Sequence, residues 1–187
     1  MTSIVLIRHG ATAWSGSRYL GRTDLPLTAA GRESARIMAE LVAATTPVDV
    51  RIVSSPSLRA RETAATVAEA IGRRTVVAVE PDVRWAEVDV GDAEGLTFEE
   101  AEERFPTLAR QLAVAEIEID WPGGETAASF RARITAAWAD VVSAGRPTIV
   151  VSHAGSIRVA MALATGRPEA GIAFLAPAEA VHLEVDD

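Results

Sequence analysis

Short runs of valine and isoleucine alternate with long alanine-rich segments along this chain, and this alternation constrains the fold more than any other feature. The apolar runs lack polar alternation, which is typical of strands covered on both faces; they are residues 4–7, 50–53, 76–79 and 148–152. Amphipathic helical periodicity marks the other segments, at residues 28–45, 57–71, 97–105, 126–143 and 156–165. Strands that alternate with helices predict the α/β class, as a three-layer α/β/α sandwich with a mainly parallel sheet.

Local signals mark the ends of several of these elements. Thr28 stands before the first helical segment, and Thr97 is followed three residues later by Glu100, which is the spacing of a capping box. Residues 181–185 alternate apolar with polar side chains. This pattern predicts a further strand nearer an edge of the sheet.

Size and charge exclude several functional classes. With 187 residues the chain can form one substantial hydrophobic core, so residues 1–187 are expected to be a single domain. The net charge of -8 opposes broad binding to nucleic acid, which depends on many basic contacts with phosphates. No apolar run approaches the roughly 18 residues of a membrane span, and no signal core begins the chain. We therefore expect a cytoplasmic protein without nucleic-acid or membrane partners, and leave its oligomeric state open, with a homodimer among the outcomes.

The absence of cysteine narrows the chemistry further. It excludes disulfides, thiolate zinc sites and a cysteine nucleophile. With three histidines in the whole chain, a dedicated metal site is not expected, and no cofactor is expected either. A site for a phosphate in so acidic a protein would have to be built locally, from a few arginines that converge in one pocket.

Chemically versatile side chains follow two of the predicted strands. Arg8 and His9 come directly after residues 4–7, and His153 comes directly after residues 148–152. Ligands of open α/β sheets bind at the carboxyl ends of the strands. We therefore expect these side chains, distant in sequence, to meet in space.

Two further candidates have rivals of the same type nearby. Arg59 and Arg61 stand at the start of one helix, where residues two apart point roughly 200° away from each other, so only one of them can face a pocket. Glu87 lies in a loop punctuated by glycines. Other acids of this loop could take its place or simply face solvent; they are Asp89, Asp92 and Glu94.

Four separated motifs together resemble the histidine phosphatase superfamily, in its phosphoglycerate-mutase-like branch. In the order of that family they are Leu6-Ile7-Arg8-His9-Gly10, residues 54–64, residues 85–95 and Val151-Ser152-His153-Ala154-Gly155. The resemblance extends over nearly the whole chain, from residue 4 to about residue 163. It implies an active site in which His9 is phosphorylated and Glu87 donates a proton, with a phosphate pocket completed by Arg8, Arg59 and His153.

The residue types suit these implied roles. A neutral imidazole can attack phosphorus through one nitrogen while its other nitrogen donates to a backbone acceptor. Arginine forks match phosphate oxygens and spread the charge of an in-line transfer, so they can replace a metal. A positioned carboxyl can protonate a poor leaving group. The family's arginine directly precedes an alanine, as Arg59 precedes Ala60, which favours Arg59 over Arg61; His182 matches no motif of the family.

The resemblance also suggests the surroundings of this site. About residues 82–122 have weak periodicity with several glycines and prolines, and we interpret them as a segment inserted over the active site within the single domain. Candidate substrate-binding residues are Gly10, Ser15, Gly21 and Ala154. Ser15 stands where the family often carries asparagine, which leaves the substrate preference open. Residues 19–28 resemble small broad-specificity, sugar-phosphate or α-ribazole phosphatases of the superfamily.

The resemblance thus predicts a metal-independent phosphomonoesterase that acts through a phosphohistidine on a small phosphorylated metabolite. One alternative is a phosphoglycerate-type mutase, which must grip a second phosphate; between Glu87 and Gly123 the chain offers Arg104 and Arg110 among several glutamates. Another is a phosphate-ester-binding regulatory protein without turnover. A nucleotide-binding Rossmann domain is the weakest alternative, because no GxGxxG or Walker-type loop is present.

Overall fold

A five-stranded sheet forms the centre of the computed structural model, which describes residues 1–47, 49–72, 77–113 and 119–185. The strands are β1 (Thr2–Arg8), β2 (Arg51–Ser54), β3 (Val79–Pro81), β4 (Thr148–Ser152) and β5 (Ala180–Val185). Their order is β3-β2-β4-β1-β5, and the pairings are parallel except that β5 runs antiparallel to β1. The predicted α/β class with a mainly parallel sheet is confirmed.

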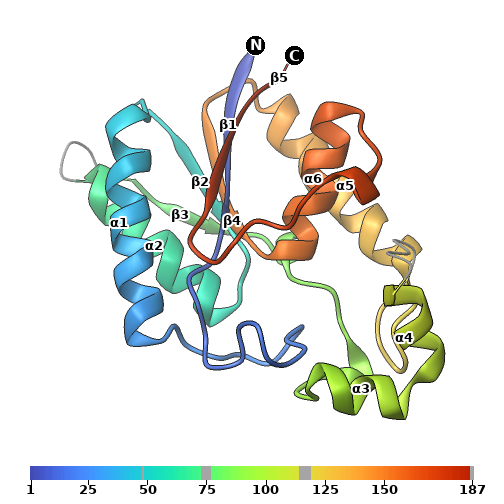
Figure 1. Ribbon diagram of the computed structural model, residues 1–187. Helices are drawn as coiled ribbons and strands as arrows, with labels where there is room; N and C mark the ends of the chain where they lie inside the picture. The colour runs from blue at the N-terminus through green and yellow to red at the C-terminus, as the bar shows by residue number, and fades with distance from the viewer. Residues whose placement is uncertain (48, 73–76, 114–118, 186–187) are drawn as a thin grey trace.

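Two helical layers cover the sheet (Figure 1). Helices α1 (Ala29–Thr45) and α2 (Leu58–Gly72) pack on one face, and helices α5 (Ala127–Ser143) and α6 (Ala154–Thr165) pack on the other. Successive side chains of β1 enter opposite cores: Val5 and Ile7 lie with α1 and α2, whereas Ile4 and Leu6 lie with α5 and α6. Burial on both faces explains why the strand sequences are apolar without alternation.

The chain between β3 and α5 lies beyond the carboxyl ends of the strands. It contains the short helices α3 (Phe98–Arg104) and α4 (Pro106–Ala113), at the lower right of Figure 1. The 3₁₀ turns η1 (Val83–Trp85) and η2 (Gly91–Ala93) precede them, and η3 (Glu169–Gly171) follows α6. The predicted caps at Thr28 and Thr97 are confirmed, the latter as a complete capping box with Glu100.

Most boundaries differ from the sequence expectation by one or two residues, and three elements need comment. The strand expected at residues 76–79 begins at Val79, where it pairs with Ile52 of β2; residue 76 lies outside the described residues. Helix α6 begins at Ala154 because the extended backbone of His153 already serves as its N-cap. Helix α4 was not expected, because it lies in the segment of weak periodicity; it begins at Pro106, and proline fits the first turn of a helix.

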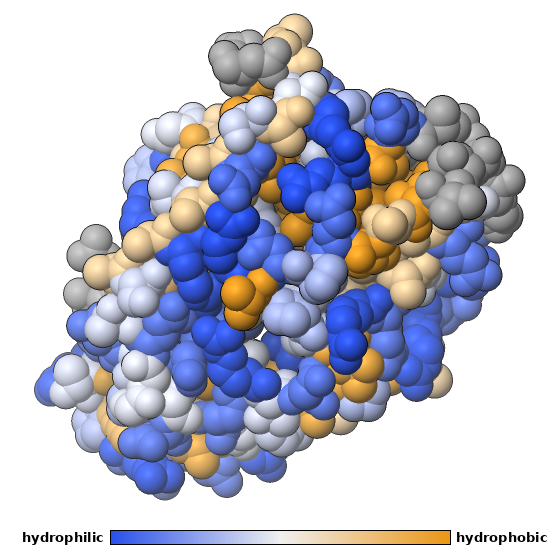
Figure 2. Space-filling view, turned by 180° about the vertical axis from the view of Figure 1, so that it is seen from behind, coloured by the Kyte–Doolittle hydropathy of each residue, from blue (hydrophilic) through white to orange (hydrophobic). Residues whose placement is uncertain are grey.

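The surface is more hydrophilic than the composition as a whole, in which hydrophobic residues make up 49%. Seen from behind, the molecule is mainly hydrophilic, with apolar residues gathered in a few patches (Figure 2). Among the residues that the structure describes, no helix combines the length and apolar character needed to cross a membrane.

The central strand β4 provides a test of the core. Ile149 is 0% exposed between the helical layers, whereas Ile37 on α1 is 51% exposed. Ile149→Ala should lower the free energy of unfolding by about 2–5 kcal/mol, because it removes packed methyl groups and leaves a cavity. Ile37→Ala is the matched control and should change it by less than about 1 kcal/mol. Urea unfolding measures both; equal losses would contradict the described core.

Candidate active site

The pairing of β1 with β4 brings the two predicted histidines together. Arg8 is level with Ser152 in the parallel register, and the backbone N–H of His9 donates to the carbonyl of Ser152 at 3.0 Å. The residue that directly follows each of these strands is a histidine, His9 after β1 and His153 after β4. The ring centroids of His9 and His153 lie 5.0 Å apart, with an angle of 64° between the ring planes.

His9 is held as a neutral imidazole with a defined tautomer. Its Nδ1 lies 2.7 Å from the carbonyl oxygen of Gly10, which can only accept, so Nδ1 carries the proton. The lone pair is therefore on Nε2, where it accepts from Arg59 Nε at 3.2 Å. Burial, followed by the charge of Arg59, lowers the pKa of His9 to about 3, with Arg8 adding to the effect and the Gly10 hydrogen bond opposing it. Nε2 is thus the nitrogen available for attack.

Arg59 stands in the first turn of α2 and is fully buried. Its Nη1 donates to the carbonyl of Thr23 and its Nη2 to the carbonyl of Gly21, both at 2.9 Å. Arg61, the rival arginine, is exposed. The helix therefore directs Arg59 and not Arg61 toward the histidines.

Glu94 supports Arg59 from outside the cavity. Its carboxylate accepts the backbone N–H groups of Gly21, Arg22 and Thr23 at 3.0, 2.9 and 3.3 Å. The same turn presents the carbonyls that accept from Arg59. Glu94 therefore orders the turn that fixes the guanidinium.

Arg8 contributes a second buried cation. Its Nη1 donates to the carbonyl of Leu175 at 2.6 Å, and its Nε has no hydrogen-bond partner among the described residues. Burial lowers the pKa of Arg8, against the opposing charges of Glu87 and Glu179. Arg8 is thus only partly satisfied within the protein, which leaves donors for an anion.

His153 is fully buried beside His9. Its Nε2 lies 2.8 Å from Ser55 Oγ and 3.4 Å from Ser57 Oγ, while Nδ1 has no partner in the part of the chain described. Burial, followed by the charge of Arg59, holds the pKa of His153 well below its usual range. His153 is therefore a neutral ring that can exchange hydrogen bonds with a bound ligand.

Glu87 lies opposite these groups, in the irregular segment after η1. Its Oε1 accepts the backbone N–H of Val88 at 3.0 Å, and its Oε2 accepts that of Gly155 at 3.1 Å. It faces a cavity of about 230 Å³ lined by Gly21, Arg22, Asp24, Pro56, Ser57, Ala86, Glu87 and His153. Of the four acids weighed from the sequence, Glu87 is the one that lines this cavity.

The residues predicted to bind substrate have mixed positions. Gly21 lines the cavity, but its N–H is already taken by Glu94. The N–H of Gly10 donates to Thr63 Oγ1 at 3.1 Å, and Ser15 Oγ accepts a backbone N–H within its own turn. Ala154 is the first residue of α6. The geometry alone does not bring Gly10, Ser15 and Ala154 together with the cavity, and their role in binding stays a prediction.

The site brings two arginines, Arg8 and Arg59, next to two neutral imidazoles, and the neighbouring cavity is lined by His153 and by the carboxylates of Glu87 and Asp24. Within residues 1–47, 49–72, 77–113 and 119–185, no group of three or more histidine, cysteine, aspartate or glutamate side chains could hold a metal ion. An anion with several oxygens would find guanidinium donors on Arg8 and Arg59. Nε2 of His9 carries a lone pair, and the Glu87 side chain lines the cavity beside His153.

Sequence reasoning missed three polar supports of this arrangement. Ser55 meets His153, Glu94 orders the turn beneath Arg59, and Arg133 of α5 binds the backbone around Glu87. Glu94 was weighed only as a rival of Glu87 and not as a support of the turn, and Arg133 did not stand out because a mid-helix arginine is usually solvated.

Comparisons with known proteins show the family of the chain. The family model of the histidine phosphatase superfamily (branch 1) matches residues 4–187. Phosphoglycerate mutase-like protein 4 of Arabidopsis thaliana is 33% identical over 83% of this chain and 67% of its own length. The bifunctional protein Rv2228c of Mycobacterium tuberculosis is 35% identical over 87% of this chain, which spans 44% of that protein. A mycobacterial glucosyl-3-phosphoglycerate phosphatase solved with VO3 has a TM-score of 0.84 and 30% identity, covering 98% of this chain and 93% of its own.

The environment of His9 predicts its protonation state. Because its pKa is lowered to about 3, the ring should stay neutral at pH 5, where an ordinary imidazole with a pKa of about 6.5 is mostly protonated. Nitrogen-15 NMR of labelled protein should show a protonated Nδ1 and a bare Nε2 for His9 between pH 5 and 7.5. The urea-unfolded protein is the control, with all histidines titrating near pH 6.5. Protonation of both His9 nitrogens at pH 6 would contradict the described burial.

Proposed function

The chain belongs to the histidine phosphatase superfamily (branch 1), and on that premise we propose that it is a phosphomonoesterase that acts through a phosphohistidine at His9 on a small phosphorylated metabolite. The observation that carries the proposal is the tautomer of His9, whose Nδ1 is held by a backbone carbonyl while its buried Nε2 faces Arg59. This arrangement prepares one nitrogen as a nucleophile.

In the first half-reaction, Nε2 of His9 attacks phosphorus and the ester P–O bond breaks. Arg8 and Arg59 stabilise the negative charge of the transferring group. In the free protein Arg59 Nε donates a hydrogen bond to His9 Nε2, and in the reaction it donates instead to a phosphoryl oxygen. Glu87 gives its proton to the departing oxygen, because an alkoxide is a poor leaving group. The products are an alcohol and phosphorylated His9.

In the second half-reaction, water attacks the phosphorus of the phosphohistidine. Glu87, now a carboxylate, takes the proton from this water as the P–N bond breaks. Inorganic phosphate leaves, and His9 and Glu87 return to their starting states. Because two arginines supply the positive charge, the reaction needs no metal ion.

The organic part of the ester has room next to Glu87. Val88 and Gly155, which donate to the two carboxylate oxygens of Glu87, also line a second cavity of about 590 Å³. Aromatic and aliphatic side chains form much of its wall, including Trp121, Phe130 and Phe174. This cavity favours a small organic substrate over a macromolecular one.

Trapping the covalent intermediate tests the proposal. Incubation with a ³²P-labelled phosphate ester in excess EDTA, followed by an alkaline quench, should label the wild-type protein and release labelled inorganic phosphate. His9→Ala should lose both the label and turnover while its circular dichroism spectrum is retained, because the nucleophile is absent. Turnover by folded His9→Ala at the wild-type rate would refute the phosphohistidine.

The same experiment tests two further parts of the proposal. Loss of wild-type labelling in EDTA, restored by a divalent ion, would refute metal independence. Transfer of the label to a second hydroxyl of the substrate would indicate a mutase.

Glu87 can be separated from its neighbours through the leaving group. An alkyl oxygen needs a proton to depart, whereas p-nitrophenolate does not. Glu87→Gln should therefore slow single-turnover labelling of His9 from a sugar phosphate by about 10²- to 10⁴-fold, and labelling from p-nitrophenyl phosphate much less. The exposed Glu103→Gln should leave both rates unchanged. Equal slowing for the two esters would show that Glu87 only shapes the cavity.

A further inference from the structure

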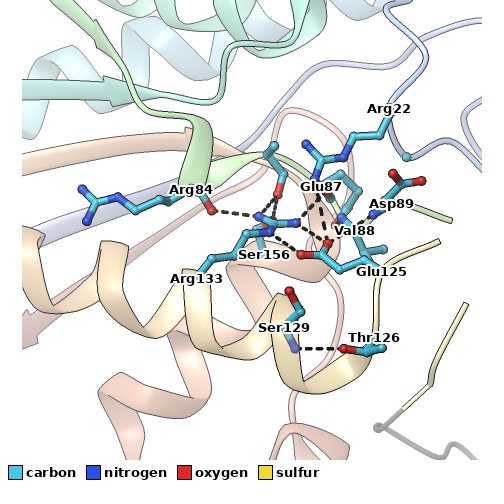
Figure 3. Close-up of polar contacts among 12 residues, drawn as sticks. Arg22, Arg84, Glu87, Val88, Asp89, Glu125, Thr126, Ser129, Arg133 and Ser156 are labelled. Atoms are coloured by element: carbon cyan, nitrogen blue, oxygen red, sulfur yellow. Dashed lines mark hydrogen bonds and ion pairs between the residues drawn. The ribbon is translucent and has the colours of Figure 1, made fainter. Parts of the chain in front are cut away.

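Arg133 of α5 binds the backbone of the segment that carries Glu87 (Figure 3). Its Nη1 donates to the carbonyls of Arg84 and Ala86 at 2.8 and 2.6 Å, and its Nη2 donates to the carbonyl of Glu87 at 2.9 Å. Its Nε and Nη2 donate to the two carboxylate oxygens of Glu125 at 2.7 and 2.8 Å. These five hydrogen bonds use all five donors of the guanidinium.

Backbone pairing supports only part of the segment that Arg133 binds. Residues 86–90 belong to no helix or strand; the carbonyls of Asp89 and Val90 accept backbone N–H groups, whereas those of Ala86 and Glu87 have no backbone partner among the described residues. Side chains from three elements take that place: Arg133 of α5, Ser152 of β4, which donates to the carbonyl of Trp85, and Ser156 of α6, which donates to that of Ala86. The path of the chain at Glu87 is therefore fixed by side chains.

Glu125 keeps the guanidinium in this orientation. The side chain of Glu125 is 10% exposed and that of Arg133 is 17% exposed. Glu125 also accepts the N–H of Asp89 at 3.3 Å, on the far side of Glu87. Burial raises the pKa of Glu125, but its hydrogen bonds with Arg133 and the charge of that residue outweigh burial and lower it. The Arg133–Glu125 pair is thus hydrogen-bonded to the backbone both before and after Glu87.

The position of the Glu87 carboxylate depends on this backbone. One of its oxygens accepts from Val88, within the gripped segment, and the other accepts from Gly155 in the first turn of α6. The approach to α6 is close, since a Cβ at Gly155 would lie 2.6 Å from Glu87 Oε1. A small movement of the segment would therefore carry the carboxylate away from the Gly155 donor on α6 and from the departing oxygen.

We propose that Arg133, held by Glu125, is a positioning residue that keeps the Glu87 carboxyl within reach of the leaving-group oxygen. This inference rests on the proposed function of Glu87 as the proton donor. Arg133 is not among the residues that line either of the two cavities, and it acts through the backbone carbonyls of Arg84, Ala86 and Glu87. A lysine cannot replace it, because one ammonium group has three donors at a single point and cannot span three carbonyls and a carboxylate.

The test compares Arg133→Lys with the wild type in single-turnover labelling of His9. Labelling from a sugar phosphate should slow by about 10- to 100-fold, as for a reacting group displaced by about 1 Å. Labelling from p-nitrophenyl phosphate should change little, because that leaving group needs no proton. Arg84→Lys is the matched control: its guanidinium faces Asp82 and Asp140 at the base of the same segment, so both rates should match the wild type.

A double-mutant cycle shows whether Arg133 acts through Glu87. In the Glu87→Gln background, Arg133→Lys should change the sugar-phosphate rate by less than about twofold, because the proton donor is already lost. Circular dichroism and urea unfolding establish that each variant is folded. If Arg133→Lys does not fold, Glu125→Gln takes its place, since loss of one carboxylate oxygen loosens the guanidinium and should give the same selective slowing.

The outcomes separate this inference from the proposed function. No labelling of wild-type His9 by either ester would refute the proposed function itself. With a labelled wild type, equal slowing of both esters in Arg133→Lys, full additivity with Glu87→Gln, or the same selective loss in Arg84→Lys would each overturn the positioning role and leave the phosphohistidine intact.

Discussion

The parallel pairing of β1 with β4 is the contact on which the whole site depends. It places Leu6 opposite Val150, both fully buried, so the hydrophobic burial that stabilises the sheet also sets its register. A slip of one residue would shift His153 by about 3.3 Å relative to His9 and turn the buried side chains of one strand to the opposite face. The separation of the two imidazoles is thus maintained by the core and not by bonds between them.

The buried cations are held in a way that preserves their charge. Arg59 is bound by the carbonyls of Gly21 and Thr23, and Arg8 by the carbonyl of Leu175. A carbonyl is neutral, so it satisfies the hydrogen-bond donors of an arginine and leaves the positive charge in place. A paired carboxylate would cancel that charge. Arg133 is different, because Glu125 neutralises it while it grips the backbone. A protein with a net charge of -8 can therefore present a positive interior to a phosphate.

The sequence predicted those parts of the site that follow from local rules. Apolar runs located the strands, and the strand-end rule placed His9 and His153 together. Helical geometry separated Arg59 from Arg61, which face different ways as expected. The three layers, the mainly parallel sheet and the edge position of β5 also followed the patterns, with shifts of a few residues at β3 and α6, whereas the order of the strands was not predicted.

The separate roles of the acidic residues in the loop around Glu87 could not be predicted from the sequence. Glu87 and Glu94 stand in one glycine-containing loop with similar neighbours, yet one lines the cavity and the other binds the turn beneath Arg59. The difference comes from contacts with α5, β4 and α6, which are far along the chain. Chain order has a related consequence for β1, which precedes its partners β4 and β5 by more than a hundred residues, while Leu175, just before β5, binds Arg8. During synthesis the chain therefore carries His9 and Arg59 long before His153 and Leu175 exist, and the site can be assembled only after β4 and the segment before β5 have been made.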